Sequence, residues 1–235
     1  MSSKPAQTLT PLKRFWREWA RPLLTVAIVL TSLRSAVADW NDVPSGSMRP
    51  TILEGDRIFV NRLAYDLKVP FTTWHLAQWA DPQRGEIVVL QSPVDGKRLV
   101  KRVVGIPGDL IEVRGQRLYI NGTPAVYGPT NPLDLAARQI AGLKGGQMAQ
   151  ETFDGCRHLV MAQSSDGPGS DYGPTRVPAG QYFLMGDHRD SSFDSRFWGF
   201  ADRRLILGRA SAVVFSLDYD RYFAPRWRRF GLGLS

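Results

Sequence analysis

Beyond residue 40 the chain consists of short runs of β-branched and aromatic residues that Gly, Pro and Asp interrupt, with little helical periodicity. Asn121-Gly122 is a tight-turn signal, and 105–109 has the composition of a turn. This pattern predicts a mainly β body built from antiparallel sheets. The expected strands are 56–61, 86–91, 99–105, 110–114, 117–121, 158–163, 181–185 and 210–215. A smaller β-rich insertion is expected at about 110–180, with loops at 128–150 and 164–179 because Gly, Pro, Ala and Ser are frequent there.

The N-terminal segment has two possible interpretations. Basic residues precede an apolar run at 22–33, and Arg34 ends that run shortly before Ala36-Val37-Ala38. The run is short for a membrane span and typical of a cleaved signal peptide, and Ala36-Val37-Ala38 resembles a cleavage site. The alternative is an uncleaved transmembrane anchor at 21–40, with Trp40 at headgroup level. Both interpretations predict a basic cytoplasmic tail at 1–20 and an exported body at 41–235.

The net charge of +8 is concentrated at the two ends of the chain. Residues 1–21 and 221–235 contribute +4 each, and the remainder is neutral. A nucleic-acid-binding domain usually spreads basic residues over a folded face, so this distribution favours anionic lipid as the partner and no nucleic acid. Arginines alternate with aromatic residues at 219–230, which favours contact with a membrane interface. The aromatic residues of 65–82 fit core packing equally well.

Segment 44–51 holds Ser45 and Ser47 on either side of a glycine, between two prolines. Prolines restrict the backbone and glycine permits unusual dihedral angles, so such a segment can present a hydroxyl in one fixed orientation. Taken alone, the composition favours an ordinary loop, since Ser, Gly and Pro are the common loop residues.

A serine nucleophile needs a base, and none of the three histidines lies in a recognisable triad context. Lysine is the alternative base when an apolar environment lowers its pKa. Lys101 lies in a predicted strand, where alternation places it on the same face as Leu99 and Val103. Without further evidence, a strand-edge lysine that reaches solvent is the favoured interpretation.

Segment 186–199 is dense in polar residues and directly follows the predicted strand 181–185. Its three carboxylates, Asp187, Asp190 and Asp194, are typical of a metal-binding loop. Arg189 and Arg196 lie beside them, so carboxylate–guanidinium pairs are favoured over a metal.

These segments, in this order, resemble the bacterial type I signal peptidases between about residues 36 and 216. The nucleophile box of that family is similar to 44–51, its next strand to 55–60, its lysine box to 101–109 and its last box to 186–199. Each motif alone is weak, whereas four ordered motifs make chance agreement improbable. The resemblance also favours the anchor at 21–40 over a cleaved signal peptide.

The resemblance implies the roles of the site residues. Ser47 would be the nucleophile and Lys101 the neutral general base, with the Ser47 N–H and the Ser45 hydroxyl forming the oxyanion hole. Ser192 would orient Lys101 through a hydrogen bond, and Asp194 and Arg196 would form a bracing ion pair. The pockets for small side chains would be lined by Val43, Met48, Ile52, Leu99 and Val100. No metal or organic cofactor is implied.

The implied activity is cleavage of signal peptides from exported preproteins after A-x-A, by a monomer anchored once in the bacterial inner membrane with its body on the periplasmic side. The sequence departs from the common pattern at His188, where asparagine is frequent, and one span is visible instead of two. Two other functions stay open at this point. One is another Ser–Lys processing peptidase, such as a conjugation or pilin type. The other is a non-enzymatic β-domain tethered to the membrane.

Overall fold

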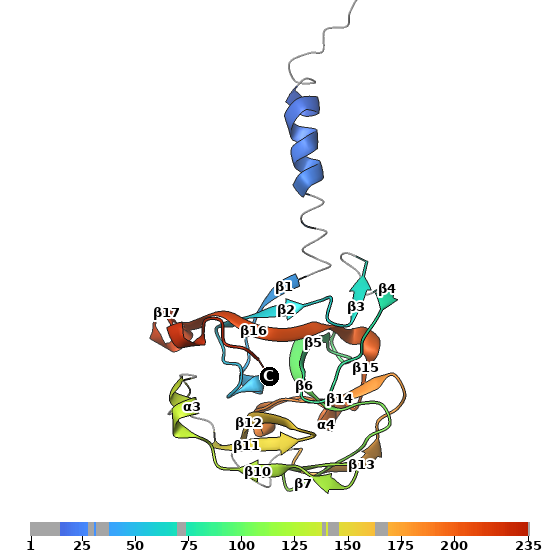
Figure 1. Cartoon of the computed structure of the whole chain (residues 1–235), viewed down its shortest axis with the longest axis vertical. Helices are drawn as coiled ribbons and strands as arrows, with labels where there is room; N and C mark the ends of the chain where they lie inside the picture. Colours follow the sequence, from blue (N-terminus) through green and yellow to red (C-terminus); the bar gives the residue numbers. More distant parts are fainter. Residues whose placement is uncertain are drawn as a thin grey trace, which may run out of the picture.

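The computed structural model describes residues 15–27, 31, 38–69, 74–137, 140, 146–162 and 169–234. Residues 15–27 are helical, with Trp16–Ala20 (η1) in a π-helical turn, and Figure 1 shows this helix outside the β body. Within the described residues, no helix has the length and apolar character that a membrane crossing needs. Part of the predicted anchor lies outside the described residues. Its last residues, 38–40, belong to strand β1 rather than to a helix, so the predicted end of the anchor at Trp40 is wrong.

One large antiparallel sheet forms the centre of the body, in the order β1-β2-β16-β5-β6-β14-β15, with β17 paired to β16. Its strands are β1 (Ala38–Asp42), β2 (Asp56–Asn61), β5 (Ile87–Gln91), β6 (Arg98–Gly105), β14 (Gln181–Met185), β15 (Ala201–Asp202), β16 (Ile206–Asp218) and β17 (Ala224–Pro225). The predicted fold class, mainly β with antiparallel pairing, is therefore confirmed.

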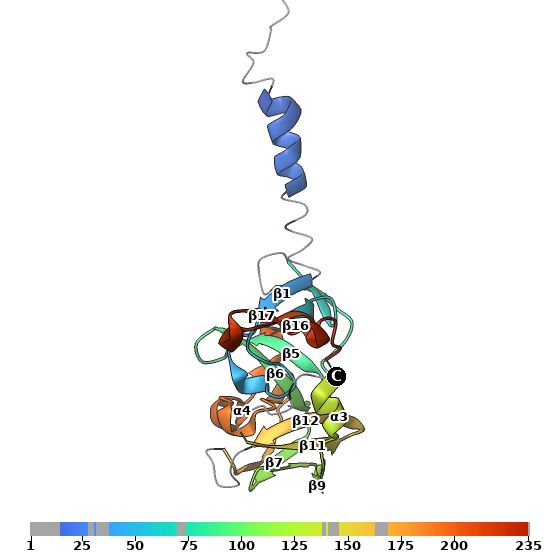
Figure 2. The same cartoon turned by 90° about the vertical axis from the view of Figure 1, so that its left-hand side faces the viewer.

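Two further sheets lie in the sequence between β6 and β14, inside the predicted insertion. The first contains β10 (Val126–Gly128), β11 (Gln147–Phe153) and β12 (Cys156–Ala162), and the second contains β7 (Leu110–Arg114), β8 (Arg117–Ile120), β9 (Thr123–Pro124) and β13 (Tyr172–Arg176). Figures 1 and 2 place β7, β11 and β12 at the end of the body remote from β1. A separate hairpin of β3 (Asp66–Lys68) and β4 (His75–Gln78) lies beside β2 in Figure 1.

The helical elements of the body are short. They are η2 (Gly46–Met48), α3 (Pro132–Ala137), η3 (Arg189–Ser191), α4 (Ser195–Trp198), η4 (Arg203–Leu205), η5 (Tyr219–Arg221) and η6 (Trp227–Arg229). The two stretches predicted as loops contain α3, the start of β11 and β13, so that prediction is wrong there. Strand β13 carries Gly173 and Pro174 and pairs through an irregular register, which explains why its sequence does not indicate a strand.

The start of β6 separates two parts of the hydrophobic core. Val100 packs against the cluster that contains Val43 and Met48. Leu99, the preceding residue, packs instead against a cluster on the other face of the sheet, together with Trp198. This is the alternation expected of a strand buried on both faces.

Two strand edges stay unpaired where the site is formed. Among the described strands, β1 pairs with β2 alone. Strand β14 reaches β6 at Arg102, Val103 and Gly105, so the segment 98–101 has β5 on one side and none of the described strands on the other. Both free edges therefore have backbone groups available for an added strand.

Candidate active site

The segment that carries Ser47 connects β1 to β2 as a tight turn. Ser45 is extended, and Gly46–Met48 form the η2 turn, which the Arg49 N–H closes on Gly46 O at 3.0 Å. A Cβ at Gly46 would lie 2.6 Å from Glu54 Oε1, the end of a flexible side chain. On the other side, the His188 N–H donates to Ser47 O at 3.1 Å. The nucleophile segment is therefore held by its own turn and by the last box.

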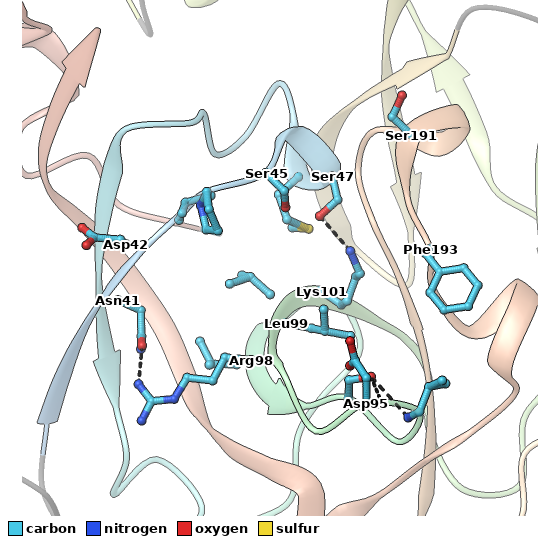
Figure 3. A pocket seen from close by; sticks show the side chains of 17 residues that line it. Asn41, Asp42, Ser45, Ser47, Asp95, Arg98, Leu99, Lys101, Ser191 and Phe193 are labelled. Atoms are coloured by element: carbon cyan, nitrogen blue, oxygen red, sulfur yellow. Dashed lines mark hydrogen bonds between the residues drawn. The ribbon is translucent and has the colours of Figure 1, made fainter. Parts of the chain in front are cut away.

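Lys101 enters the site from β6, opposite Val88 of β5. Its side chain is buried, with the residue 2% exposed, and Nζ donates to Ser47 Oγ at 2.7 Å (Figure 3). Loss of hydration lowers the pKa of Lys101 to about 8; Asp194 opposes this shift and Arg196 adds to it. An amine with this pKa is neutral in about a tenth of the molecules at pH 7.

Asp194 and Arg196 form a fully buried ion pair beside the site. Arg196 Nε and Nη2 donate to the two Asp194 carboxylate oxygens, each at 2.9 Å. The same carboxylate accepts from the N–H of Gly186 at 2.9 Å, and Arg196 also donates to Arg189 O at 2.6 Å. The pair therefore ties both ends of the last box together.

Ser192 is 4% exposed, and its hydroxyl has no hydrogen-bond partner among the described residues. The predicted hydrogen bond between Ser192 and Lys101 is thus not formed. Ser192 nevertheless lies close to the nucleophile segment, because a Cβ on Gly186 would be 2.2 Å from Ser192 Oγ and 2.4 Å from Ser47 O. Gly186 is required where these two segments meet.

A cavity of about 430 Å³ lies over the contact between Ser47 and Lys101. Four of the five predicted pocket residues line it, namely Val43, Met48, Leu99 and Val100. The fifth, Ile52, has no exposed surface and packs in the core, so its predicted role in a substrate pocket is wrong. Ser45 is exposed and faces the cavity near Ser47 in Figure 3.

The sequence did not indicate several residues that line the same cavity. They are Asn41, Asp42, Pro44, Val89, Ser92, Val94, Asp95, Arg98, Ser191 and Phe193. Arg98 connects β6 to β1, because its Nη1 donates to Asn41 Oδ1 at 2.7 Å and to Asp39 Oδ2 at 3.0 Å. The only available signal for Phe193 was an aromatic residue inside an otherwise polar motif.

Buried ion pairs lie next to the site. Their partners are distant in the sequence and differ from the neighbouring residues that the sequence suggested. Asp187 pairs with Arg102 of β6 rather than with the adjacent arginine, through contacts of 2.9 and 2.8 Å. Arg189 instead reaches Glu151 of β11, at 2.8 and 2.5 Å. Burial lowers the pKa of His158, which lies 3.1 Å from Glu151, and keeps that imidazole neutral. The Arg189–Glu151 pair joins the insertion to the last box, and the Asp187–Arg102 pair joins the last box to β6.

The chain was compared with known proteins. The family model described as signal peptidase, peptidase S26, matches residues 16–215. Signal peptidase I of Pseudomonas fluorescens is 32% identical over 228 residues, covering 92% of this chain and 78% of the relative. Signal peptidase I of Pseudomonas aeruginosa is 33% identical over 233 residues, with the same coverage. A crystal structure of a signal peptidase I from Enterococcus faecalis is 29% identical, covers 56% of this chain and 98% of that chain, and gives a TM-score of 0.35.

The chain therefore belongs to the signal peptidase family, peptidase S26. Within it, the chain is a serine endopeptidase of the bacterial type I class, which acts in signal peptide processing. This result contradicts the alternative of a non-enzymatic β-domain.

Proposed function

We propose that this protein cleaves signal peptides from exported preproteins after A-x-A, with Ser47 as nucleophile and Lys101 as general base. The observation that supports this assignment is the 2.7 Å contact between Lys101 Nζ and Ser47 Oγ, made by a lysine that is 2% exposed. Burial is what makes lysine usable as a base, because it favours the neutral amine.

The reaction follows from this geometry. Neutral Lys101 accepts the proton of the Ser47 hydroxyl while Ser47 Oγ attacks the carbonyl carbon of the scissile bond. The Ser47 N–H and the Ser45 hydroxyl stabilise the oxyanion. Lys101 then transfers its proton to the leaving amine, and the C–N bond breaks to give an ester on Ser47. A water molecule, deprotonated by Lys101, attacks that ester. The bond between Ser47 Oγ and the acyl carbon breaks, Lys101 returns the proton to Ser47 Oγ, and the signal peptide leaves with a free carboxyl group.

Small side chains would be selected by the cavity wall between β1 and β6. Val43, Met48 and Val100 line it with apolar surface, and Met48 is almost completely buried beneath. A shallow apolar pocket excludes bulky side chains by steric clash more sharply than it ranks small ones. We expect alanine or a similarly small residue at the first and third positions before the cut.

We also propose that the enzyme is a monomer anchored in the bacterial inner membrane by one N-terminal span, with the body on the periplasmic side. Membrane lipid would be a partner of the body as well. Exposed aromatic residues support this, since Tyr222 is 99% exposed and Trp227 70% within the basic C-terminal segment. Trp74, next to the β3–β4 hairpin, is 75% exposed. Aromatic side chains beside arginines suit a lipid interface.

A cleavage assay in detergent tests the proposed chemistry. A preprotein with an A-x-A site is incubated with the wild-type enzyme, Ser47→Ala, Lys101→Ala and Lys101→Arg, and mass spectrometry identifies the new N-terminus. Cleavage after the second alanine by the wild type alone supports both assignments. Guanidinium is always protonated near neutral pH, so activity of Lys101→Arg would contradict the role of Lys101 as base. Lys97→Ala, at a largely exposed lysine, is the matched control.

A further inference from the structure

One wall of the catalytic cavity carries an exposed aromatic ring that the proposed chemistry does not use. Phe193 lies between η3 and α4, lines the cavity and is 59% exposed. Figure 3 shows its ring on the side of Lys101 opposite Asn41, and Leu99 lines the same cavity. A large apolar side chain at the edge of a catalytic cavity offers contact area to whatever binds there.

The position of Phe193 is fixed by its neighbours. Its ring packs against Phe197 with centroids 5.5 Å apart, and its carbonyl oxygen accepts a hydrogen bond from Trp198 Nε1 at 3.3 Å. Phe197 in turn lies under the backbone of Gly169, where a Cβ would be 3.0 Å from the ring. The aromatic surface is therefore supported from behind and exposed toward the cavity.

The strand edges indicate which part of a bound peptide meets this wall. An extended peptide that pairs with the free edges of β1 and 98–101 presents alternate side chains to opposite faces. The first and third residues before the cut point to the face where Val100 packs with Val43 and Met48. The second residue points to the other face, where Leu99 and Trp198 pack against one cluster and where Trp198 Nε1 donates to the carbonyl of Phe193.

We propose that Phe193 and Leu99 form an apolar subsite for the middle residue of A-x-A, two positions before the cut. This inference rests on the proposed function. Such a subsite makes this enzyme selective for the middle residue, whose side chain would be free to vary if it pointed to solvent. Large apolar side chains are favoured there, because they cover both residues. Acidic side chains are disfavoured, because Asp95 also lines the cavity and hydrogen bonds from Ser92 and Lys97 keep the pKa of its carboxyl at about 2.

The test uses the full chain in detergent and peptides that differ only in the middle residue, with alanine on both sides of it. For the wild type, leucine should give kcat/KM about five- to tenfold higher than serine, and aspartate should give the lowest value. Phe193→Ala should reduce the leucine preference over serine to about twofold, mainly by lowering kcat/KM for the leucine peptide. Phe193→Leu should restore most of the preference, because it keeps an apolar side chain at the same place.

Phe223→Ala is the matched control, because Phe223 is 62% exposed and does not line the cavity. That variant should keep the wild-type preference. Equal rates for leucine, serine and aspartate in the wild type would overturn the inference while leaving the proposed function intact. The inference would also be overturned if the effect of Phe193→Ala on kcat/KM depended on the residue after the cut instead of the middle residue. Failure of the wild type to cleave any of the peptides would instead show that the proposed function is wrong.

Discussion

Replacement of Lys101 by methionine should stabilise the folded protein at neutral pH and abolish cleavage. The pKa of this amine falls from 10.5 to about 8 on folding, so the unfolded chain binds more protons between these values. Stability therefore rises with pH through that window, and the cost of burying Lys101 is fully present below about pH 8. A shift of this size corresponds to about 3 kcal/mol. The lost hydrogen bond to Ser47 offsets about 1 kcal/mol of the gain, so a net stabilisation of about 2 kcal/mol is expected at pH 7.

The pH dependence is the decisive part of this prediction. Urea unfolding of the full chain in mild detergent, at pH 7 and at pH 9.5, measures the free energy of unfolding of the wild type and of Lys101→Met. The difference between them should decrease by about 2 kcal/mol over this interval, because the folded-state amine loses its proton near pH 8 and no longer has to be buried as a cation. Lys97→Met is the control and should show no such change, because Lys97 is largely exposed. Parallel profiles of the wild type and Lys101→Met would refute the reasoning.

Four further predictions concern the same site. The cleavage rate should fall about 50-fold from pH 8 to pH 6, because the neutral fraction of the base falls by this factor; a flat rate profile would contradict the mechanism. Ser192→Ala should reduce kcat less than Ser47→Ala without lowering the melting temperature, since the Ser192 hydroxyl has no hydrogen-bond partner to lose in the described part of the chain. Gly186→Ala should abolish cleavage, because its Cβ would lie 2.4 Å from Ser47 O; Gly128→Ala, in open space, should be fully active. Asp187→Asn should destabilise the fold by about 3–5 kcal/mol in urea unfolding, because it leaves a buried guanidinium unpaired; a change below 1 kcal/mol would contradict this account.

Local pattern was sufficient for most strands of the large sheet. The predicted ranges 56–61, 110–114 and 181–185 agree with β2, β7 and β14 at both ends. These segments alternate or are continuously apolar, so their side chains alone indicate extended structure. Strand β11 carries mostly polar residues, and its pairing with β12 decides its conformation. Tertiary contacts override weak local preference in such segments.

The same distinction applies to the candidate site, where local motifs indicate some residues and only tertiary contacts place the others. The motifs identified Ser47 and Lys101 by residue type and by their order along the chain. They also identified the ion pair of Asp194 and Arg196, because the two residues are close in sequence. Ile52 was assigned to a pocket by its position near the nucleophile, although it packs in the core.

The sequence by itself determined the mainly β class and indicated Ser47 and Lys101 as the proposed reacting groups, because both inferences depend on residue type and short-range pattern. Only the tertiary structure decided that Lys101 is dehydrated, since its burial results from residues brought together across 54 positions of chain at Ser47. It also decided that Asp187 pairs with Arg102 across 85 positions. Such long-range contacts leave no local pattern in the sequence, because they result from how the sheet closes around its core.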